Sequence, residues 1–565
     1  MTSDCILLSL PQGLERTRVE GWTQQFFDLG EGEEQGYHRP HQAPGVWAPP
    51  PATMTLRGGP ERTSVWYRSQ FTHPGWAERT LLRFDGAFMA ANVWLNGRLL
   101  GSHYGSPGPF GFDISSFLQV ENSISVCVQA TPDGGFLPPA LADLREEDRR
   151  WWPLGLVDRV WLERVGSVAI EALEATWRIT PGQAEARLRT VVRNLDAREM
   201  EVTVGWQLSP PEEEDGQPAR GVARWRRTAT LSGRGSRVLE TRVSVDRPQL
   251  WWPWTLGGQA LYGLSASVDC GDRRSTAAQR EVGVREIHLE PFGGGLAWMV
   301  NGQRHFPRGA VLPPLPPGED GDPIGAWRLA GLDLALARGQ VPGERTAALA
   351  DRSGVMLVVD PPPSPQRDDG VDEQDHVREA IALVASHASA AVLLQRGVGE
   401  GFDMPATTAA EEPYTVTAAA REEVEAVRRS KFAPATALVL ERLPDLDEAG
   451  GALAATTALL DWSPLPDRDG LLLRFSVVND DAATRGRATV RWSIRPQAGG
   501  GWRRRERRGD LQVLLPAPEQ PPAVYEVEVP APVREGTLVV EVTLTLGDEI
   551  LSSLAYEIEP GERTY

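Results

Sequence analysis

The sequence has few cysteines and no long apolar run. Its three cysteines, Cys5, Cys127 and Cys270, are far apart and lack metal-ligand spacing, so they indicate small buried residues in a reducing compartment. No apolar run approaches the roughly 18 residues that span a bilayer, and the short run 6–8 lacks the basic flank of a signal peptide. We therefore expect a cytoplasmic protein with no metal, no cofactor and no membrane partner.

Positively charged residues are also fewer than negatively charged ones. The formal net charge is −19, which argues against nucleic acid as a partner. The apolar fraction of 41% and the charged fraction of 24% are those of a globular protein with real hydrophobic cores. At 565 residues the chain is long enough for three to five domains.

Three regions alternate apolar and polar residues over strand lengths, with turn signals between the runs. Residues 60–165 contain "SVWYRSQF", "RTLLRFDGA" and "AANVWLNGRLLG", in which Asn96-Gly97 is a strong hairpin signal because both residues tolerate positive φ. Residues 166–287 have the strand spacing of an immunoglobulin-like sandwich, and residues 468–559 repeat that style. The sequence predicts three β-sandwiches.

Between 296 and 460 the pattern changes to continuous apolar strands that alternate with helices, which is typical of a parallel sheet covered on both faces. About five β/α units fit there, whereas a complete β/α barrel needs about 250 residues. We therefore expect an incomplete TIM barrel. The predicted strands are 304–312, 333–339, 355–360, 390–397 and 435–441, and the predicted helices are 324–332, 343–354, 372–387, 416–430 and 447–460.

Several motifs resemble glycoside hydrolase family 2, which includes β-galactosidases, β-glucuronidases, β-mannosidases and exo-β-glucosaminidases. Phe84-Asp85-Gly86, "VWLNG" and "FGFDI" resemble its sugar-binding jelly roll, and "WWPLGLVDRVWLE" resembles the segment that closes that domain. "QLWWPWTLGGQALYGL" resembles its immunoglobulin-like domain, while "GVREI" and "MVNGQRHFPRGAVLPP" resemble the start of its barrel.

The resemblance implies a mainly β, multidomain fold. Its four parts are a jelly roll over residues 1–165, an immunoglobulin-like sandwich over 166–288, a shortened β/α domain over 289–462 and a C-terminal sandwich over 463–565. An open sheet has edges that loops, sandwiches or a second subunit must cover, so we also consider self-association.

At the fourth barrel strand, this sequence departs from the catalytic pattern of the family. "SHASAAVLLQRGVGEG" lies where the family has a His-Pro-Ser strand that ends in Asn-Glu, whose Glu is the acid/base, and here Gly397 and Val398 occupy those two places. The segment that carries the nucleophilic Glu in the family has no counterpart in this sequence, so we expect that it is deleted here. His387 is interpreted as a structural hydrogen-bonding residue and not as a base.

Retaining glycosidases need two carboxyl groups about 5–5.5 Å apart, held at the carboxyl ends of barrel strands. Glu400 after the fourth strand and Glu441 at the end of "ALVLE" are the two candidates. The alternative is that Glu400 is a loop carboxylate and Glu441 a strand-end residue, neither of them catalytic.

Trp151, Trp152 and Arg338 are the candidate carbohydrate-binding residues. The two tryptophans offer flat faces to sugar rings, and Arg338 stands where the resemblance expects an arginine. The alternative makes the tryptophans core residues, as we expect for Trp251 and Trp252.

Three hypotheses on function stay open. The first is a non-catalytic carbohydrate-binding or scaffold protein derived from a β-glycosidase. The second is an active β-glycosidase with Glu400 as acid/base, and the third is an assembly protein that binds no sugar.

Overall fold

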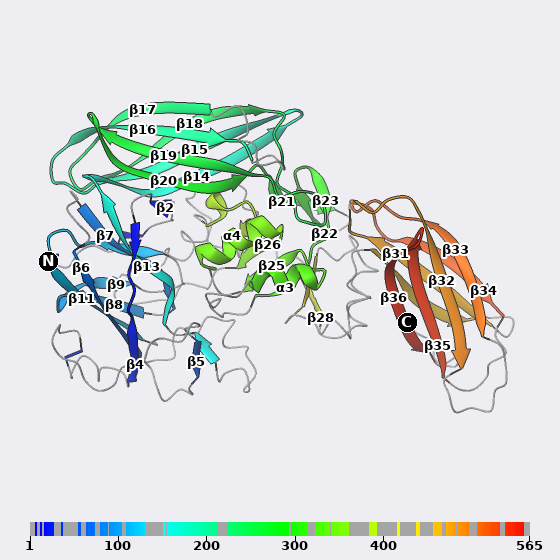
Figure 1. The fold of residues 1–565 in the computed structure, drawn as a ribbon. Helices are drawn as coiled ribbons and strands as arrows, with labels where there is room; N and C mark the ends of the chain where they lie inside the picture. Colours follow the sequence, from blue (N-terminus) through cyan, green and yellow to red (C-terminus); the bar gives the residue numbers. More distant parts are fainter. Residues whose placement is uncertain are drawn as a thin grey trace.

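The computed structural model is built mainly from β-sheets (Figure 1). It describes, with shorter gaps inside several of the ranges, residues 6–7, 12–13, 16–27, 36–37, 55–57, 64–129, 151–312, 323–360, 383–392, 415–418, 437–440 and 456–558. The immunoglobulin-like sandwich lies across the jelly roll and the β/α domain, and the C-terminal sandwich lies on the far side of the β/α domain from the jelly roll (Figure 1).

The jelly roll consists of two five-stranded antiparallel sheets whose facing side chains form one apolar core. One sheet has the order β1 (Ile6–Leu7), β10 (Phe110–Asp113), β7 (Arg79–Phe88), β13 (Gly155–Val165) and β3 (Arg16–Arg18). The other has the order β4 (Thr23–Phe27), β6 (Ser64–Thr72), β11 (Glu121–Gln129), β8 (Ala90–Leu95) and β9 (Arg98–His103). A separate pair joins β5 (Thr55–Arg57) to β12 (Trp151–Pro153).

The hairpin predicted at Asn96-Gly97 is confirmed. The two residues join β8 to β9 with φ values of 52° and 80°, a combination that fits a type I′ turn and that glycine and asparagine adopt most readily.

The second sandwich packs a three-stranded sheet on a five-stranded sheet. The first has the order β14 (Val168–Thr180), β15 (Gln183–Asn194) and β18 (Ser236–Asp246). The second has the order β17 (Ala223–Leu231), β16 (Met200–Ser209), β19 (Leu261–Cys270), β20 (Arg273–Gly283) and β2 (Gln12–Gly13). Strand β2 comes from the amino-terminal region, so that region adds a strand to this domain as well as to the jelly roll.

A three-stranded meander leads into the β/α domain, formed by β21 (Ile287–Phe292), β22 (Gly295–Val300) and β23 (Gln303–His305). The domain itself is a parallel sheet with the order β27 (Ala390–Val392), β26 (Met356–Asp360), β25 (Leu334–Arg338), β24 (Arg308–Val311), β29 (Ala437–Leu440) and β28 (Thr415–Ala418). Helices α3 (Pro323–Leu329) and α4 (Glu344–Ser353) lie between its strands in the sequence.

The predicted covering of both sheet faces is confirmed for the central strands. Ala335 and Leu357 pack into a core that includes Trp327 of α3 and Ala347 of α4, while Leu336 packs into a second core with residues of the meander. Each strand therefore reads as a continuous apolar run, because neither face is open to water.

Two predicted helices and one predicted strand are wrong in part. Residues 416–418 belong to strand β28, and residues 456–460 belong to β30 (Thr456–Pro464), the first strand of the C-terminal sandwich. Strand β30 is buried on both faces, with Leu459 in the β/α core and Leu460 in the sandwich core, so its apolar residues do not alternate. The predicted strand 304–312 is two strands of different sheets, β23 and β24.

The C-terminal sandwich has two antiparallel sheets around its own core, as predicted. Their orders are β30, β31 (Leu471–Asn479) and β34 (Ala523–Val529) in one, and β33 (Arg507–Leu514), β32 (Arg487–Pro496), β35 (Leu538–Leu546) and β36 (Glu549–Ile558) in the other. In the described part of the chain, no helix has the length and apolar character that a membrane crossing requires.

Candidate functional site

The carboxyl ends of the parallel strands meet at one edge of the sheet, which is where a barrel-type active site is built. Backbone pairing places Arg338, the last residue of β25, opposite Asp360, the last residue of β26. Arg338 is thus at the predicted edge. Asp360 was not singled out from the sequence, although a carboxylate that ends an apolar strand is a signal that would have found it.

The two candidate catalytic glutamates fall outside the described residues. Strand β29 ends at Leu440, which pairs with Ala310 of β24, and Glu441 is the next residue in the sequence. Strand β27 ends at Val392, and Glu400 belongs to the segment after it. Their roles stay predictions, as does the separation between their carboxyl groups.

Trp151 and Trp152 belong to β12, whose backbone pairs with β5 and with neither of the large jelly-roll sheets. Trp151 pairs with Arg57 and Trp152 with Leu56. This places the backbone of both residues on a two-stranded ribbon, and their proposed contact with sugar stays a prediction.

The amino edge of the same sheet holds a buried polar cluster around Asp333, which precedes β25. Its carboxylate accepts hydrogen bonds from Thr255 Oγ1 at 2.5 Å and from the Arg308 backbone N–H at 2.8 Å. His305 Nε2 lies 3.0 Å from the same carboxylate. Burial alone would raise the pKa of Asp333, but His305 and Arg308 outweigh it and hold that pKa below its ordinary value.

This cluster joins three domains. Thr255 belongs to the immunoglobulin-like domain, and the buried Arg308 side chain reaches Asp480 of the C-terminal sandwich, with Nε 3.3 Å from Oδ2. Asp333 is fully buried, so its carboxylate is stable there only because it is hydrogen-bonded and faces cations. We assign the cluster a structural role.

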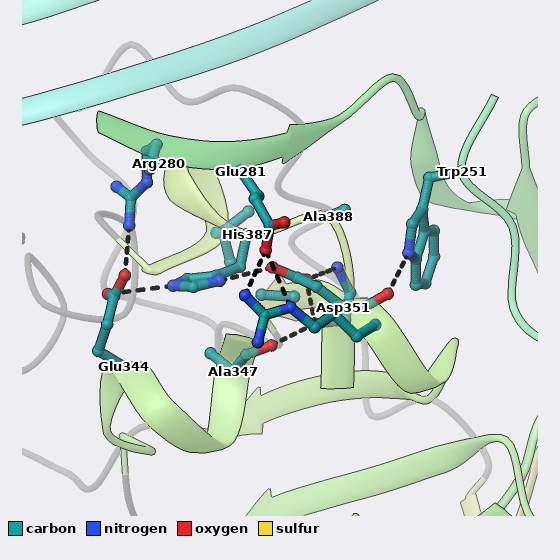
Figure 2. Close-up of polar contacts among 12 residues, drawn as sticks. Trp251, Arg280, Glu281, Glu344, Ala347, Asp351, His387 and Ala388 are labelled. Carbon is teal, nitrogen blue, oxygen red and sulfur yellow. Dashed lines mark hydrogen bonds and ion pairs between the residues drawn. The ribbon is translucent and has the colours of Figure 1, made fainter. Parts of the chain in front are cut away.

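A second polar cluster lies around His387, just before β27 (Figure 2). Its Nδ1 is 2.7 Å from Asp351 Oδ2 and its Nε2 is 3.1 Å from Glu344 Oε2, both on helix α4. Asp351 Oδ1 also accepts hydrogen bonds from the backbone N–H and the hydroxyl of Ser389, at 2.6 and 2.7 Å. The interpretation of His387 as a structural residue fits these contacts.

The family-like motifs before the barrel form the other half of this junction. Trp251 is fully buried and donates its indole N–H to the Asp351 backbone carbonyl at 2.7 Å. A Cβ atom on Gly283 would lie 2.5 Å from the Ala388 Cβ, so only glycine fits there. Arg285 donates to the backbone carbonyls of four residues, which are Val384, His387, Ala388 and Ala390.

Within the described residues, no group of three or more His, Cys, Asp or Glu side chains has the arrangement of a metal site. Because both polar clusters have partners in neighbouring domains, we interpret them as domain junctions at the amino edge, the end of a β/α fold that serves stability.

Two family models match the amino-terminal half of the chain. The sugar binding domain of glycosyl hydrolases family 2 matches residues 33–162, and the domain described as glycosyl hydrolases family 2 matches residues 168–285. These ranges correspond to the jelly roll and the immunoglobulin-like sandwich.

Among characterised proteins, the chain is 27% identical to an exo-β-D-glucosaminidase of Amycolatopsis orientalis over 258 residues, 44% of this chain and 24% of the relative. It is 26% identical to an exo-β-D-glucosaminidase of Streptomyces avermitilis over 320 residues, 52% of this chain and 33% of the relative. The alignments therefore span a quarter to a third of these relatives.

Solved structures show the same fold over nearly the whole chain. The Amycolatopsis orientalis exo-chitosanase CsxA superposes with a TM-score of 0.69 at 15% identity, covering 97% of this chain and 85% of that one. A β-D-mannosidase from Dictyoglomus thermophilum gives 0.67 at 13% identity, covering 97% and 89%. The solved structures show the fold alone, whereas the two matched domains and the sequence relatives support glycoside hydrolase family 2 over residues 33–285.

Proposed function

We propose that this chain is a non-catalytic member of its family that binds carbohydrate or serves as a scaffold. The observation that carries the proposal is Gly397-Val398, which stands where the family resemblance expects the Asn-Glu of the acid/base. Without a carboxyl group at that place, the leaving oxygen of a glycoside has no proton donor.

The size of the β/α domain supports the same proposal. The described residues form six parallel strands, whereas the packed barrel of this type has eight. A retaining mechanism needs a second carboxylate on another strand. The segment that carries this carboxylate in the family has no counterpart in this sequence. Sugar recognition needs less, because aromatic faces and a few polar groups suffice.

Trp151, Trp152 and Arg338 are the proposed sugar contacts. The matched sugar-binding domain supports carbohydrate as the partner, and the sequence relatives include glucosaminidases, so a terminal β-linked amino sugar is the first ligand to test. We further propose a cytoplasmic location and self-association through the edges of the parallel sheet.

An active β-glycosidase is the second candidate, and one observation favours it. Strand β29 ends beside β24 in the parallel sheet, and Glu441 is the next residue in the sequence, where a β/α fold carries its functional residues. With Glu400 as acid/base, Glu441 would be its partner.

The test is hydrolysis of aryl β-glycosides by the purified full chain, on a panel of galactoside, glucuronide, mannoside, glucosaminide and glucoside. Glu400→Ala and Glu441→Ala are assayed beside Glu185→Ala, an exposed glutamate on β15 that serves as the matched control. Turnover that is lost in either variant but kept in the control overturns the proposal.

The absence of turnover, together with calorimetric binding of one of the free sugars that Trp151→Ala or Trp152→Ala weakens, supports it. The absence of both turnover and binding, from a folded protein, favours the third hypothesis of an assembly protein without a sugar ligand.

A further inference from the structure

Strand β20 and helix α4 form two ion pairs of opposite orientation across the junction between the immunoglobulin-like and β/α domains (Figure 2). Arg280 of β20 contacts Glu344, the first residue of α4, at 2.7 Å. The next residue of β20, Glu281, contacts Arg352 in the last turn of α4 at 2.6 Å. Each domain therefore supplies one cation and one anion, and both helix charges have the sign that the helix dipole favours at that end.

His387 lies between the two carboxylates of the same helix face. Glu344 and Asp351 are seven positions apart, about two helical turns, so their side chains point the same way. Each ring nitrogen of His387 is at ion-pair distance from one of them, and the imidazole is 3% exposed. A neutral imidazole has a single N–H. Two ionised carboxylates, one beside each nitrogen, therefore favour a ring that carries a proton on both nitrogens.

The same contacts extend to the segment that starts strand β27. Asp351, which contacts His387, accepts hydrogen bonds from both the backbone N–H and the hydroxyl of Ser389. Arg285 of the immunoglobulin-like side contacts the carbonyl of His387 itself, at 3.0 Å. His387 thus touches α4 through its ring and the other domain through its backbone, and through Glu344 it reaches Arg280.

We propose that His387, in its imidazolium form, is the positioning residue that couples the immunoglobulin-like domain to the start of β27, so that the protonation of one buried ring sets the stability of the junction. The inference is independent of sugar binding and of any catalytic role for Glu400.

The surrounding charges determine the pH range of this coupling. The ionisable groups that face His387 are Glu344 and Asp351 from α4, Arg280 from β20 and Arg285 from the segment after β20. Burial by itself lowers the pKa of His387, but the Glu344 and Asp351 carboxylates outweigh it and raise that pKa from 6.5 to about 9. Burial by itself raises the pKa of Glu344, but His387 and Arg280 lower it from 4.5 to about 2.

A group whose pKa is raised by folding contributes stability that is complete below its unfolded pKa and is lost as the pH rises through its folded pKa. The contribution of His387 is therefore complete below 6.5 and lost through about 9. Glu344 has the opposite sign, so its contribution is complete above 4.5 and lost as the pH falls towards about 2. The junction is strongest between pH 4.5 and 6.5.

The test combines a titration with a stability profile on the full chain. In NMR spectra of ring-labelled histidine, one of the eight histidines should titrate with a midpoint near 9 and should be absent from His387→Gln. The midpoint of thermal unfolding of the native chain should fall between pH 6 and pH 9 by several degrees more than that of His387→Gln. His288→Gln, which alters a histidine of the meander that is 34% exposed, should keep the native profile.

A second variant separates charge from shape. Glu344→Gln keeps the size of the side chain and removes its charge, so the titration midpoint of His387 should move down by about one pH unit or more. A His387 signal that titrates near 6.5 in the native chain would overturn the proposal. So would equal pH profiles for the native chain and His387→Gln, or a midpoint that Glu344→Gln leaves in place. If His387→Gln does not fold, the native titration and Glu344→Gln decide the question.

Discussion

The two edges of the parallel sheet differ in what the chain has placed there. At the amino edge, buried polar residues have hydrogen-bond donors from the immunoglobulin-like domain: Thr255 donates to Asp333, and Arg285 donates to the backbone carbonyl of His387. At the carboxyl edge, β25 and β26 end in Arg338 and Asp360, and in the sequence that follows β27, Gly397 and Val398 stand where the family resemblance expects an amide and a carboxylate. The difference teaches that a domain framework and its chemistry are separable: one edge can hold three domains together whatever the other edge does.

The largest expected effect is at the amino edge, from Asp333→Ala. The substitution leaves Thr255 Oγ1, the Arg308 backbone N–H and His305 without their acceptor in a fully buried site. Removing one partner of a buried charged network costs about 3–5 kcal/mol, measured here as the free energy of unfolding in urea. Asp548→Ala, in an exposed turn, is the control. An equal, small loss in both variants would mean that the amino edge does not carry the stability.

Because the pKa of Asp333 is held below its ordinary value of 3.8, its contribution to stability is present above that value and lost as the pH falls through the folded pKa. The difference in unfolding free energy between the native chain and Asp333→Ala should therefore shrink when urea unfolding is repeated in acid. A difference that stays constant down to the acid limit of folding would contradict the assignment.

The next effect compares two ion pairs between the same strand and the same helix. Arg280 is 3% exposed and also donates to the Leu173 carbonyl, whereas Arg352 is 61% exposed. Arg280→Met should cost about 2 kcal/mol, because hydrogen bonds to charged groups contribute about that much when they are shielded from water. Arg352→Met should cost less than about 1 kcal/mol, as exposed pairs do. Urea unfolding measures both, and equal costs would remove burial as the explanation.

Many of the turns and element ends of this fold can be predicted from local sequence patterns. Asn96-Gly97 predicted its hairpin, and Gly354 predicted the end of α4, where it adopts a φ of 70°. The helix expected over 447–460 failed because Leu459 and Leu460 serve two different cores on opposite faces of one strand. A strand that is buried on both faces does not alternate apolar and polar residues, so its sequence cannot be told from that of a buried helix. Only its pairing with neighbouring strands identifies it.

The polar junctions could not be predicted for a different reason. The interpretation of His387 as a structural residue fits its contacts, but Glu344, Asp351 and Arg280 come from separate parts of the chain. The spacing of Glu344 and Asp351 on α4 shows that they share a face, yet nothing in the sequence says what lies opposite. Such partners follow from tertiary packing and not from any local pattern.

A smaller effect tests how far the Asp333 cluster extends. Thr255→Val keeps the shape of the side chain and removes the hydroxyl that donates to Asp333 at 2.5 Å. Since Asp333 keeps its contacts with His305 and Arg308, the cost should be about 1–2 kcal/mol, less than that of Asp333→Ala. Thr203→Val, on the exposed face of β16, should change stability by less than about 0.5 kcal/mol. Thermal unfolding of both variants checks the difference.

The smallest effect on stability is expected at the carboxyl edge, from Arg338→Met. The substitution is chemically the same as Arg280→Met, but Arg338 ends β25 beside Asp360, at the edge whose loops serve function in β/α folds. Its unfolding free energy should therefore stay within about 0.5 kcal/mol of the native value. If the carboxyl edge holds the proposed sugar site, affinity for the sugar that the native chain binds should fall about tenfold, or about 1.4 kcal/mol. A stability loss as large as that of Arg280→Met, with affinity unchanged, would make Arg338 a structural residue and would erase the contrast between the two edges.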